Sequence, residues 1–176
     1  MKITRFAANR MFQTLGAMAL GHLNDEALEA VMMNFNAFRK VTEEFEELKK
    51  ELFKRLYGDM ETMAEDEKKK LMEFFDLLAK MEGADAEKQT ELDALVKANY
   101  PALYDLRTKE IKVIVSLLNK EVDIELTEVD EKEFIKGVVK GKKDAPVNEI
   151  RAIFSCMFKT EKKDKADFAE LDTLID

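Results

Sequence analysis

NDEALEAVMMNFNAFRKVTEEFEELKKELFKRLYG is the stretch from Asn24 to Gly58, and it decides the fold. It contains no proline, and its one glycine is the last residue. Asn24 or Asp25 predicts an N-cap, because a short side-chain oxygen accepts hydrogen bonds from the free N–H groups of a first turn. Gly58 predicts the end of the helix, since glycine readily adopts the left-handed conformation. The stretch therefore predicts one helix over residues 25–57.

Apolar side chains recur along this helix at alternating spacings of three and four residues, which is typical of a heptad seam. The seam positions are Leu28, Val31, Phe35, Phe38, Thr42, Phe45, Lys49, Leu52 and Leu56. Val41 and Leu48 adjoin the two polar positions on one side. Met32 and Phe53 widen the stripe on the other side. This width favours a multi-helix bundle over a two-stranded coiled coil.

The predicted helix is roughly 46 Å long at 1.5 Å per residue. A chain of 176 residues offers few partner helices of that length. Either two shorter helices pack end to end along it, or a second copy of the chain covers part of it.

Composition predicts a mainly α fold, a helical bundle built on the long helix with one short β segment. The chain is 46% hydrophobic and 38% charged, with six glycines and two prolines. We expect a single domain over residues 1–176, with a possible division into a bundle over 1–120 and a strand with short helices over 121–176.

The net charge of −8 argues against nucleic acid as the partner, because phosphate binding needs a basic surface. Much of the excess lies in residues 61–99, which carry eleven acidic and six basic residues. No run of about 18 apolar residues predicts a membrane span. The single Cys156 lies in an apolar run and predicts a reduced thiol, which fits the cytoplasm.

Four further helices are expected in the first 119 residues. They are Thr4–Leu20, Thr62–Glu82, Ala86–Asn99 and Pro101–Asn119. Thr62 and Glu65 have the spacing of a capping box, and Asp85 is suited to cap the third of these helices. Pro101 suits the first position of a helix. One kinked helix over residues 86–119 is the alternative to the last two.

At residues 121–127 the spacing of apolar residues changes from a helical period to strict alternation. Val122, Ile124 and Leu126 alternate with polar residues, which predicts a half-buried strand. A lone strand leaves backbone groups unpaired, so we expect it to pair with a second copy of itself. An extended segment lying across helices is the alternative.

The last part of the chain predicts short helices. Asp130 opens one that ends at Gly141, and Pro146 opens another. The charged residues 159–165 follow. Phe168, Leu171, Leu174 and Ile175 then have the spacing of a final helix that docks on the rest of the chain.

The candidate chemical groups lack partners in the sequence. His22 has no second histidine or carboxylate at metal-ligand spacing, and Cys156 has no readable base. Four carboxylates near the predicted strand lack the order of a calcium loop: Asp123, Glu125, Glu128 and Asp130. In the long helix, the side chains of adjacent glutamates diverge by about 100°, which separates Glu43 from Glu44 and Glu46 from Glu47. We expect a solvated face in both cases.

Two lysine clusters also predict solvated surface, because neither has interleaved aromatic residues. They are Lys68, Lys69 and Lys70, and Lys136, Lys140, Lys142 and Lys143. The sequence also has no phosphate-binding glycine loop and no nucleophile elbow. We therefore expect no catalytic, cofactor-binding or metal-binding residues, and no enzyme.

The order of several features resembles small helical proteins encoded by phages and prophages. The features are the start Met1-Lys2-Ile3-Thr4, the run from Val31 to Asp59, and a helix ending Leu117-Leu118 before residues 121–126. The resemblance covers about half of the chain, the first 60 residues and residues 111–135. It implies no catalytic residues, since that group has none assigned.

Together these observations predict a non-enzymatic interaction, assembly or accessory protein. We expect it to form a homo-oligomer, with a dimer favoured, and to bind a protein partner in the host cytoplasm. The alternative is an inhibitor whose acidic residues 61–99 occupy the basic nucleic-acid site of a host enzyme, because acidic surfaces steer such partners.

Overall fold

The computed structural model describes residues 1–158 and confirms the mainly α fold, with 75% of the described chain helical. The helices are α1 (Arg5–Gly16), α2 (Asp25–Tyr57), α3 (Glu65–Glu82), α4 (Ala86–Asn99), α5 (Pro101–Asn119), α6 (Glu131–Gly141) and α7 (Val147–Phe154). A short 3-10 helix, η1, follows at Ser155–Met157. The predicted docking helix with Phe168 and Leu171, and the charged residues 159–165, lie outside the described residues.

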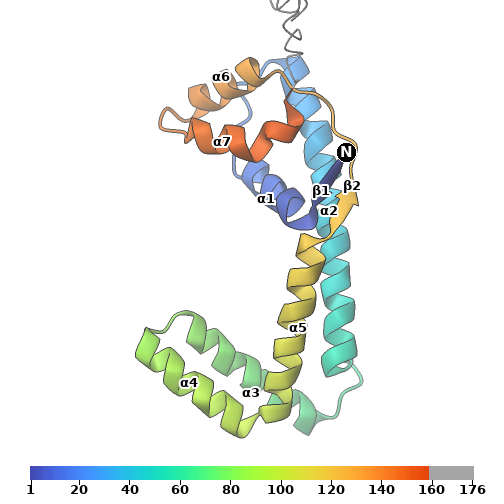
Figure 1. Ribbon diagram of the computed structural model, residues 1–176, viewed down its shortest axis with the longest axis vertical. Helices are drawn as coiled ribbons and strands as arrows, with labels where there is room; N and C mark the ends of the chain where they lie inside the picture. The colour runs from blue at the N-terminus through green and yellow to red at the C-terminus, as the bar shows by residue number, and fades with distance from the viewer. Residues whose placement is uncertain (159–176) are drawn as a thin grey trace, which may run out of the picture. The chain divides into compact units, whose positions relative to one another are not determined.

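The chain divides into two compact units (Figure 1). Among the described residues, the first unit contains Met1 and residues 9–39 and 123–158, and the second contains residues 2–8 and 40–122. Helix α2 contributes its first half to one unit and its second half to the other. The expected single domain, with a possible division after residue 120, stays a prediction.

Helix α2 runs without a break from Asp25 to Tyr57, as its sequence predicts. The Asn24 side chain accepts a hydrogen bond from the Ala27 N–H at 2.8 Å, so Asn24 is the N-cap. At the other end Gly58 adopts a φ of +96°, the left-handed conformation that favours glycine. The helix therefore begins and ends where its capping residues place it.

The buried side of α2 lies slightly to one side of the predicted seam. Its buried residues are Ala27, Ala30, Val31, Asn34, Phe38, Val41, Phe45 and Tyr57. Val41, beside the polar seam position Thr42, is buried as expected. Leu48 and Met32, which were expected to widen the stripe, are exposed. The stripe drifts because 3.6 residues per turn do not match a strict seven-residue repeat.

In the first unit, aromatic and aliphatic side chains bury the N-terminal half of α2. Phe12 of α1 stacks on Phe35 at 4.8 Å between ring centroids. Helices α6 and α7 pack against each other, with Phe134 and Phe154 in an edge-to-face contact at 5.7 Å. The predicted cap of α6 is confirmed, because Asp130 accepts from the Glu133 N–H at 2.9 Å.

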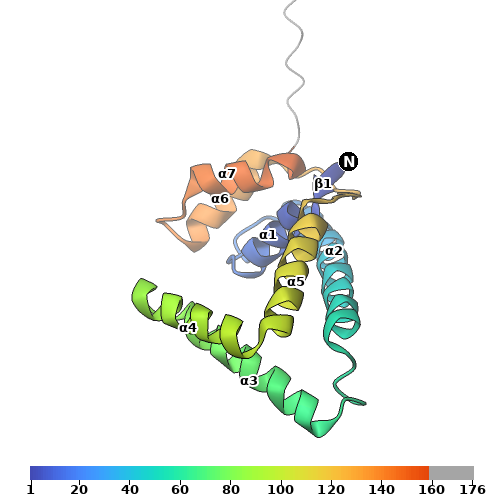
Figure 2. The same cartoon turned by 60° about the horizontal axis from the view of Figure 1, so that its bottom comes forward.

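In the second unit, α3 and α4 form a helical hairpin, and α4 packs against α5 (Figure 2). Phe53 and Tyr57 at the end of α2 contact Phe75 of α3, at 5.8 and 5.4 Å between centroids. Phe74 of α3 is fully buried. Helix α3 thus packs on the end of α2 within the second unit. The arrangement in which a second copy of the chain covers part of α2 stays a prediction.

A small antiparallel sheet joins β1 (Lys2–Thr4) to β2 (Glu121–Asp123). The predicted strand 121–127 is therefore shorter than expected, and its partner is a strand of the same chain that its sequence did not indicate. Ile124 is buried between exposed neighbours, as the alternation predicts. After Asp123 the chain remains outside any strand and lies along α2 in the first unit.

Three boundaries differ from the predictions or settle an alternative. Helix α1 ends at Gly16 and not at Leu20, because glycine is a poor helix former. Helix α3 starts at Glu65, after an N-cap at Ala64 without a side-chain bond, while the Thr62 hydroxyl donates to the Asp59 carbonyl in the preceding turn. Residues 86–119 form two helices, separated at Tyr100 where ψ is 50°.

Within residues 1–158, none of the helices is both long and apolar enough to cross a membrane.

Candidate functional site

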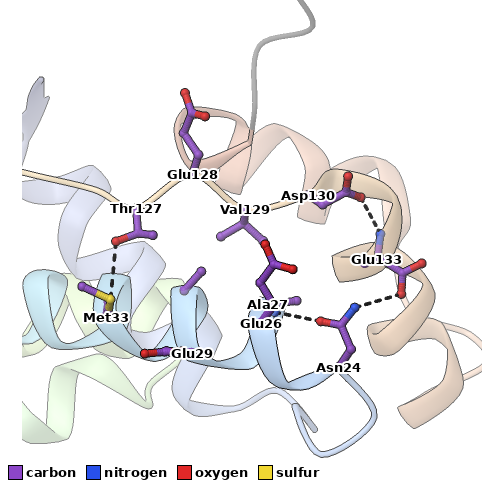
Figure 3. Close-up of a pocket in the computed structure, with 11 residues that line it drawn as sticks. Asn24, Glu26, Ala27, Glu29, Met33, Thr127, Glu128, Val129, Asp130 and Glu133 are labelled. Carbon is purple, nitrogen blue, oxygen red and sulfur yellow. Dashed lines mark hydrogen bonds between the residues drawn. The ribbon is translucent and has the colours of Figure 1, made fainter.

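An acidic groove lies in the first unit, between the first half of α2 and the segment that leads into α6 (Figure 3). Its volume is about 330 Å³. It is lined by Asn24, Glu26, Ala27, Glu29, Ala30, Met33, Thr127, Glu128, Val129, Asp130 and Glu133. We call this feature the acidic groove below.

Asn34 fixes one wall of the acidic groove. Its side-chain amide donates to the Thr127 carbonyl at 2.8 Å, and its amide oxygen accepts from the Thr127 N–H at 2.7 Å. The side chain thus forms hydrogen bonds with both the N–H and the carbonyl of Thr127, as the backbone of a neighbouring strand would. Asn34 is only 1% exposed, so these bonds satisfy an amide that would otherwise be buried without partners.

The same wall is held at two further points. The Val129 N–H donates to the Met157 carbonyl at 2.8 Å, and Val129 forms an isolated parallel bridge with Phe158. Val129 is buried. Asp130 then caps α6. The segment from Thr127 to Asp130 is therefore fixed by backbone bonds although it belongs to no helix or strand.

Five carboxylates line the acidic groove: Glu26, Glu29, Glu128, Asp130 and Glu133. None of its eleven lining residues is Lys or Arg. Glu26 rises from α2 toward Val129, and Glu128 points away from the helix (Figure 3). The Asn24 amide donates to Glu133 at 3.5 Å. Ionised carboxylates only accept hydrogen bonds, so the groove suits donors that carry positive charge.

The geometry of these carboxylates does not converge on one point. Among residues 1–158, no group of three or more His, Cys, Asp or Glu side chains is arranged to hold a metal ion. The apolar part of the lining consists of buried Ala27, Ala30 and Val129, and of Met33, whose side chain is 56% exposed. The arrangement can attract a cationic side chain and contact its apolar stem.

The predicted carboxylate cluster near the strand is split by the fold. Glu128 and Asp130 line the acidic groove, whereas Asp123 and Glu125 do not. All four are exposed. The glutamates of α2 from Glu43 to Glu47 are exposed as well, and two of them bind lysines, Glu46 with Lys49 and Glu47 with Lys50.

The two isolated candidates lie apart from the acidic groove. His22 is exposed in the turn before α2. Cys156 is partly buried, and its thiol donates to the Met11 sulfur at 3.6 Å. Burial raises the pKa of the Cys156 thiol above its usual value, which disfavours the reactive thiolate.

The lysine clusters are mainly exposed. Lys69 and Lys70 lie on the surface of α3, and Lys136 pairs with Glu133 at 3.2 Å. Lys140, Lys142 and Lys143 follow at the end of α6. None of these lysines lines the acidic groove.

Sequence reasoning missed Asn34, although its position carries a signal. Asn34 lies three residues after Val31 and four before Phe38, and both of these are fully buried. A polar residue at seam spacing inside an apolar stripe indicates a buried hydrogen-bond partner. The local sequence pattern does not indicate that this partner is Thr127, which lies 93 residues away.

A second buried polar cluster, in the second unit, was also missed. The Tyr57 hydroxyl donates to Glu110 at 2.9 Å, and Arg107 donates to the same oxygen at 2.7 Å. Glu110 is 7% exposed. Burial first, and then the hydrogen bond to Glu110, raise the pKa of Tyr57 above its usual value. The cluster ties the end of α2 to α5.

Comparison of the chain with models of protein families, with curated proteins and with solved structures finds no match in any of the three.

Proposed function

We propose that this chain is a non-enzymatic interaction protein, an assembly or accessory factor of phage or prophage origin that acts in the host cytoplasm. The resemblance of its first 60 residues and residues 111–135 to phage-encoded helical proteins supports the origin. The acidic groove supports the mode of action. We further propose that the chain forms a dimer and that it binds a protein partner.

The observation that carries the proposal is the charge of the acidic groove. Five carboxylates and no basic residue line a hollow whose walls are fixed by hydrogen bonds. Such a surface attracts Lys or Arg side chains of a protein and repels phosphates. Exposed Met33 adds a flexible apolar contact beside the charges. We therefore expect the partner to insert a basic segment.

The test is affinity purification from a bacterial host lysate, followed by titration of the purified partner. The groove variant replaces Glu26, Glu29 and Glu128 by Gln, which keeps side-chain size and removes three charges. We expect about a tenfold loss of affinity, or about 1.4 kcal/mol. Binding of the unchanged chain should also weaken as salt rises, because exposed charges are screened.

A matched control removes the same number of charges elsewhere. Glu65→Gln, Glu67→Gln and Glu87→Gln change exposed residues of α3 and α4, and should leave the affinity unchanged. The circular-dichroism spectra of the two variants establish that both are folded. Equal affinity of the groove variant and the unchanged chain would refute the role of the groove.

One observation favours the alternative, an acidic inhibitor of a nucleic-acid-binding enzyme. Ten of the eleven acidic residues in 61–99 are exposed, and only Asp93 is partly buried. The same pair of variants separates the two proposals. If the control variant on α3 and α4 loses binding while the groove variant keeps it, and nucleic acid competes for the partner, the inhibitor proposal replaces the first.

Self-association is supported by α5. Ile111 is 47% exposed and Val115 is 50% exposed, one turn apart on the same side of the helix. Glu110 is the one buried residue of α5. A helix rich in apolar residues with so little burial suits contact with a second copy of the chain.

A further inference from the structure

A second hollow lies in the second unit, between Arg5 at the start of α1 and the part of α2 that belongs to this unit. Its volume is about 950 Å³. Besides Arg5, it is lined by Lys40, Glu43, Glu44, Glu47, Leu48, Lys50, Glu51 and Lys54. We call it the Arg5 hollow. It shares no lining residue with the acidic groove.

Arg5 is a buried cation without a full counter-charge. The residue is only 9% exposed, and its Nε has no hydrogen-bond partner among residues 1–158. Its Nη1 donates to the Leu117 carbonyl at 3.5 Å, which is longer than the usual distance of about 2.9–3.0 Å. Arg5 forms no ion pair within the described part of the chain. A buried guanidinium in this state is costly, because burial removes the water that would otherwise stabilise its charge.

The neighbouring helix ends do not supply the missing negative charge. Arg5 is the first residue of α1, and the first turn of α1 contains no acidic residue. The positive end of the helix dipole therefore adds to the charge of the guanidinium. The last turn of α5, which contains Leu117, contributes only about half a negative charge. The Leu117 carbonyl also accepts from the Lys120 N–H at 3.3 Å. An unsatisfied buried group of this kind indicates a bound partner.

The charges around the Arg5 hollow favour an anion with a single charge. Glu47 binds Lys50 at 2.6 Å and Glu51 binds Arg55 at 2.8 Å, so ion pairs offset two of the four glutamates in the lining. Lys40 also lines the hollow and forms no ion pair within residues 1–158. The other two glutamates repel a doubly charged phosphate more strongly than a singly charged carboxylate.

We propose that the Arg5 hollow binds a monocarboxylate carried on a short aliphatic stem. The two oxygens of a carboxylate match the planar fork of guanidinium donors, which includes the Nε–H of Arg5. Leu48 is 38% exposed in the lining and contacts the stem. A free organic acid and a glutamate side chain of a partner protein both carry this group, and the test distinguishes them. The proposal does not depend on the function of the acidic groove.

Proton–nitrogen NMR of the isotope-labelled full chain tests the proposal at the Arg5 Nε–H itself. Sodium butyrate should shift this signal until it saturates, because the carboxylate becomes the acceptor. Butyramide has the same shape without the charge and should bind at least about tenfold more weakly. The Nε–H signals of Arg55 and Arg151 are internal references and should not move, because these groups already pair with Glu51 at 2.8 Å and Glu131 at 2.7 Å.

A capped tripeptide with a central glutamate, and its glutamine counterpart, identify the source of the carboxylate. Tighter binding of butyrate than of the glutamate peptide supports a free organic acid. Tighter binding of the glutamate peptide than of both butyrate and the glutamine peptide supports a partner protein. An Arg5 signal that moves with neither carboxylate, or moves equally with butyramide, would overturn the proposal. Inorganic phosphate that binds more tightly than either carboxylate would overturn the choice of ligand.

Variants separate the guanidinium fork from its charge. Arg5→Lys keeps the charge and loses the fork, so butyrate should bind about tenfold more weakly, as followed by amide shifts of α2. Arg55→Lys is the matched control and should leave the affinity unchanged, because Arg55 does not line the hollow. Lys40→Gln changes an exposed residue and should weaken binding about threefold. Unchanged affinity in both Arg5→Lys and Lys40→Gln would overturn the assignment.

Discussion

Asn34 shows how one buried polar residue holds a segment that has no secondary structure. Replacement by Ala removes two hydrogen bonds and leaves the Thr127 N–H and carbonyl without their partner. We expect Asn34→Ala to lower the free energy of unfolding by about 2–3 kcal/mol. The measurement is urea denaturation followed by circular dichroism. Exposed Asn36 on the same helix is the control, and an equal loss for Asn36→Ala would contradict this explanation.

Tyr57 makes stability depend on pH in the alkaline range. Its pKa in the folded chain is raised by burial, so the folded state keeps the phenolic proton after an unfolded tyrosine, with a pKa of about 10, has lost it. The stabilisation that comes from this raised pKa is therefore fully present below pH 10. Above pH 10 the free energy of unfolding falls by up to about 1.4 kcal/mol per pH unit. Urea midpoints between pH 8 and 11 measure this fall, and it should be smaller in Tyr57→Phe.

At the scale of elements, close packing of α6 against the turn before α2 depends on Gly137. A Cβ atom at this position would overlap the Leu23 side chain and lie 3.2 Å from the Leu23 backbone nitrogen. We expect Gly137→Ala to destabilise the chain by about 1–3 kcal/mol through overpacking, measured by thermal denaturation. Gly83→Ala is the control, because nothing lies within 4 Å of its added Cβ. A stabilised Gly137→Ala variant would contradict this view of the contact.

Helix boundaries were predictable where a capping side chain acts locally. Asn24, Asp85 and Asp130 each accept from a backbone N–H three residues later, as their positions indicate. Thr62 was misleading because the residues around it form a turn anchored on the Asp59 carbonyl. Strand β1 was missed because Lys2–Thr4 is too short for a period to be visible, and its pairing with β2 spans more than a hundred residues.

At the scale of the whole molecule, the acidic groove could not be found from charge along the sequence. Residues 1–60 carry nine acidic and nine basic residues and gave no reason to expect an acidic site there. The groove arises because the first turns of α2 and residues 128–133 contribute carboxylates to one place, and no lysine or arginine is among the residues that line it. Tertiary contacts such as Asn34 with Thr127 create this arrangement.

The last prediction concerns the molecule as a whole: the chain forms a dimer with a second copy of itself. On α5, Ile111 and Val115 share one side, while Val113, 40% exposed, is rotated about 200° from Ile111. If a second copy covers the first side, Ile111→Lys with Val115→Lys should halve the mass measured by light scattering, because buried lysines are costly. Val113→Lys should leave the dimer intact. A monomeric unchanged chain at the same concentration would refute self-association, and a dimer in every variant would place the interface away from this side of α5.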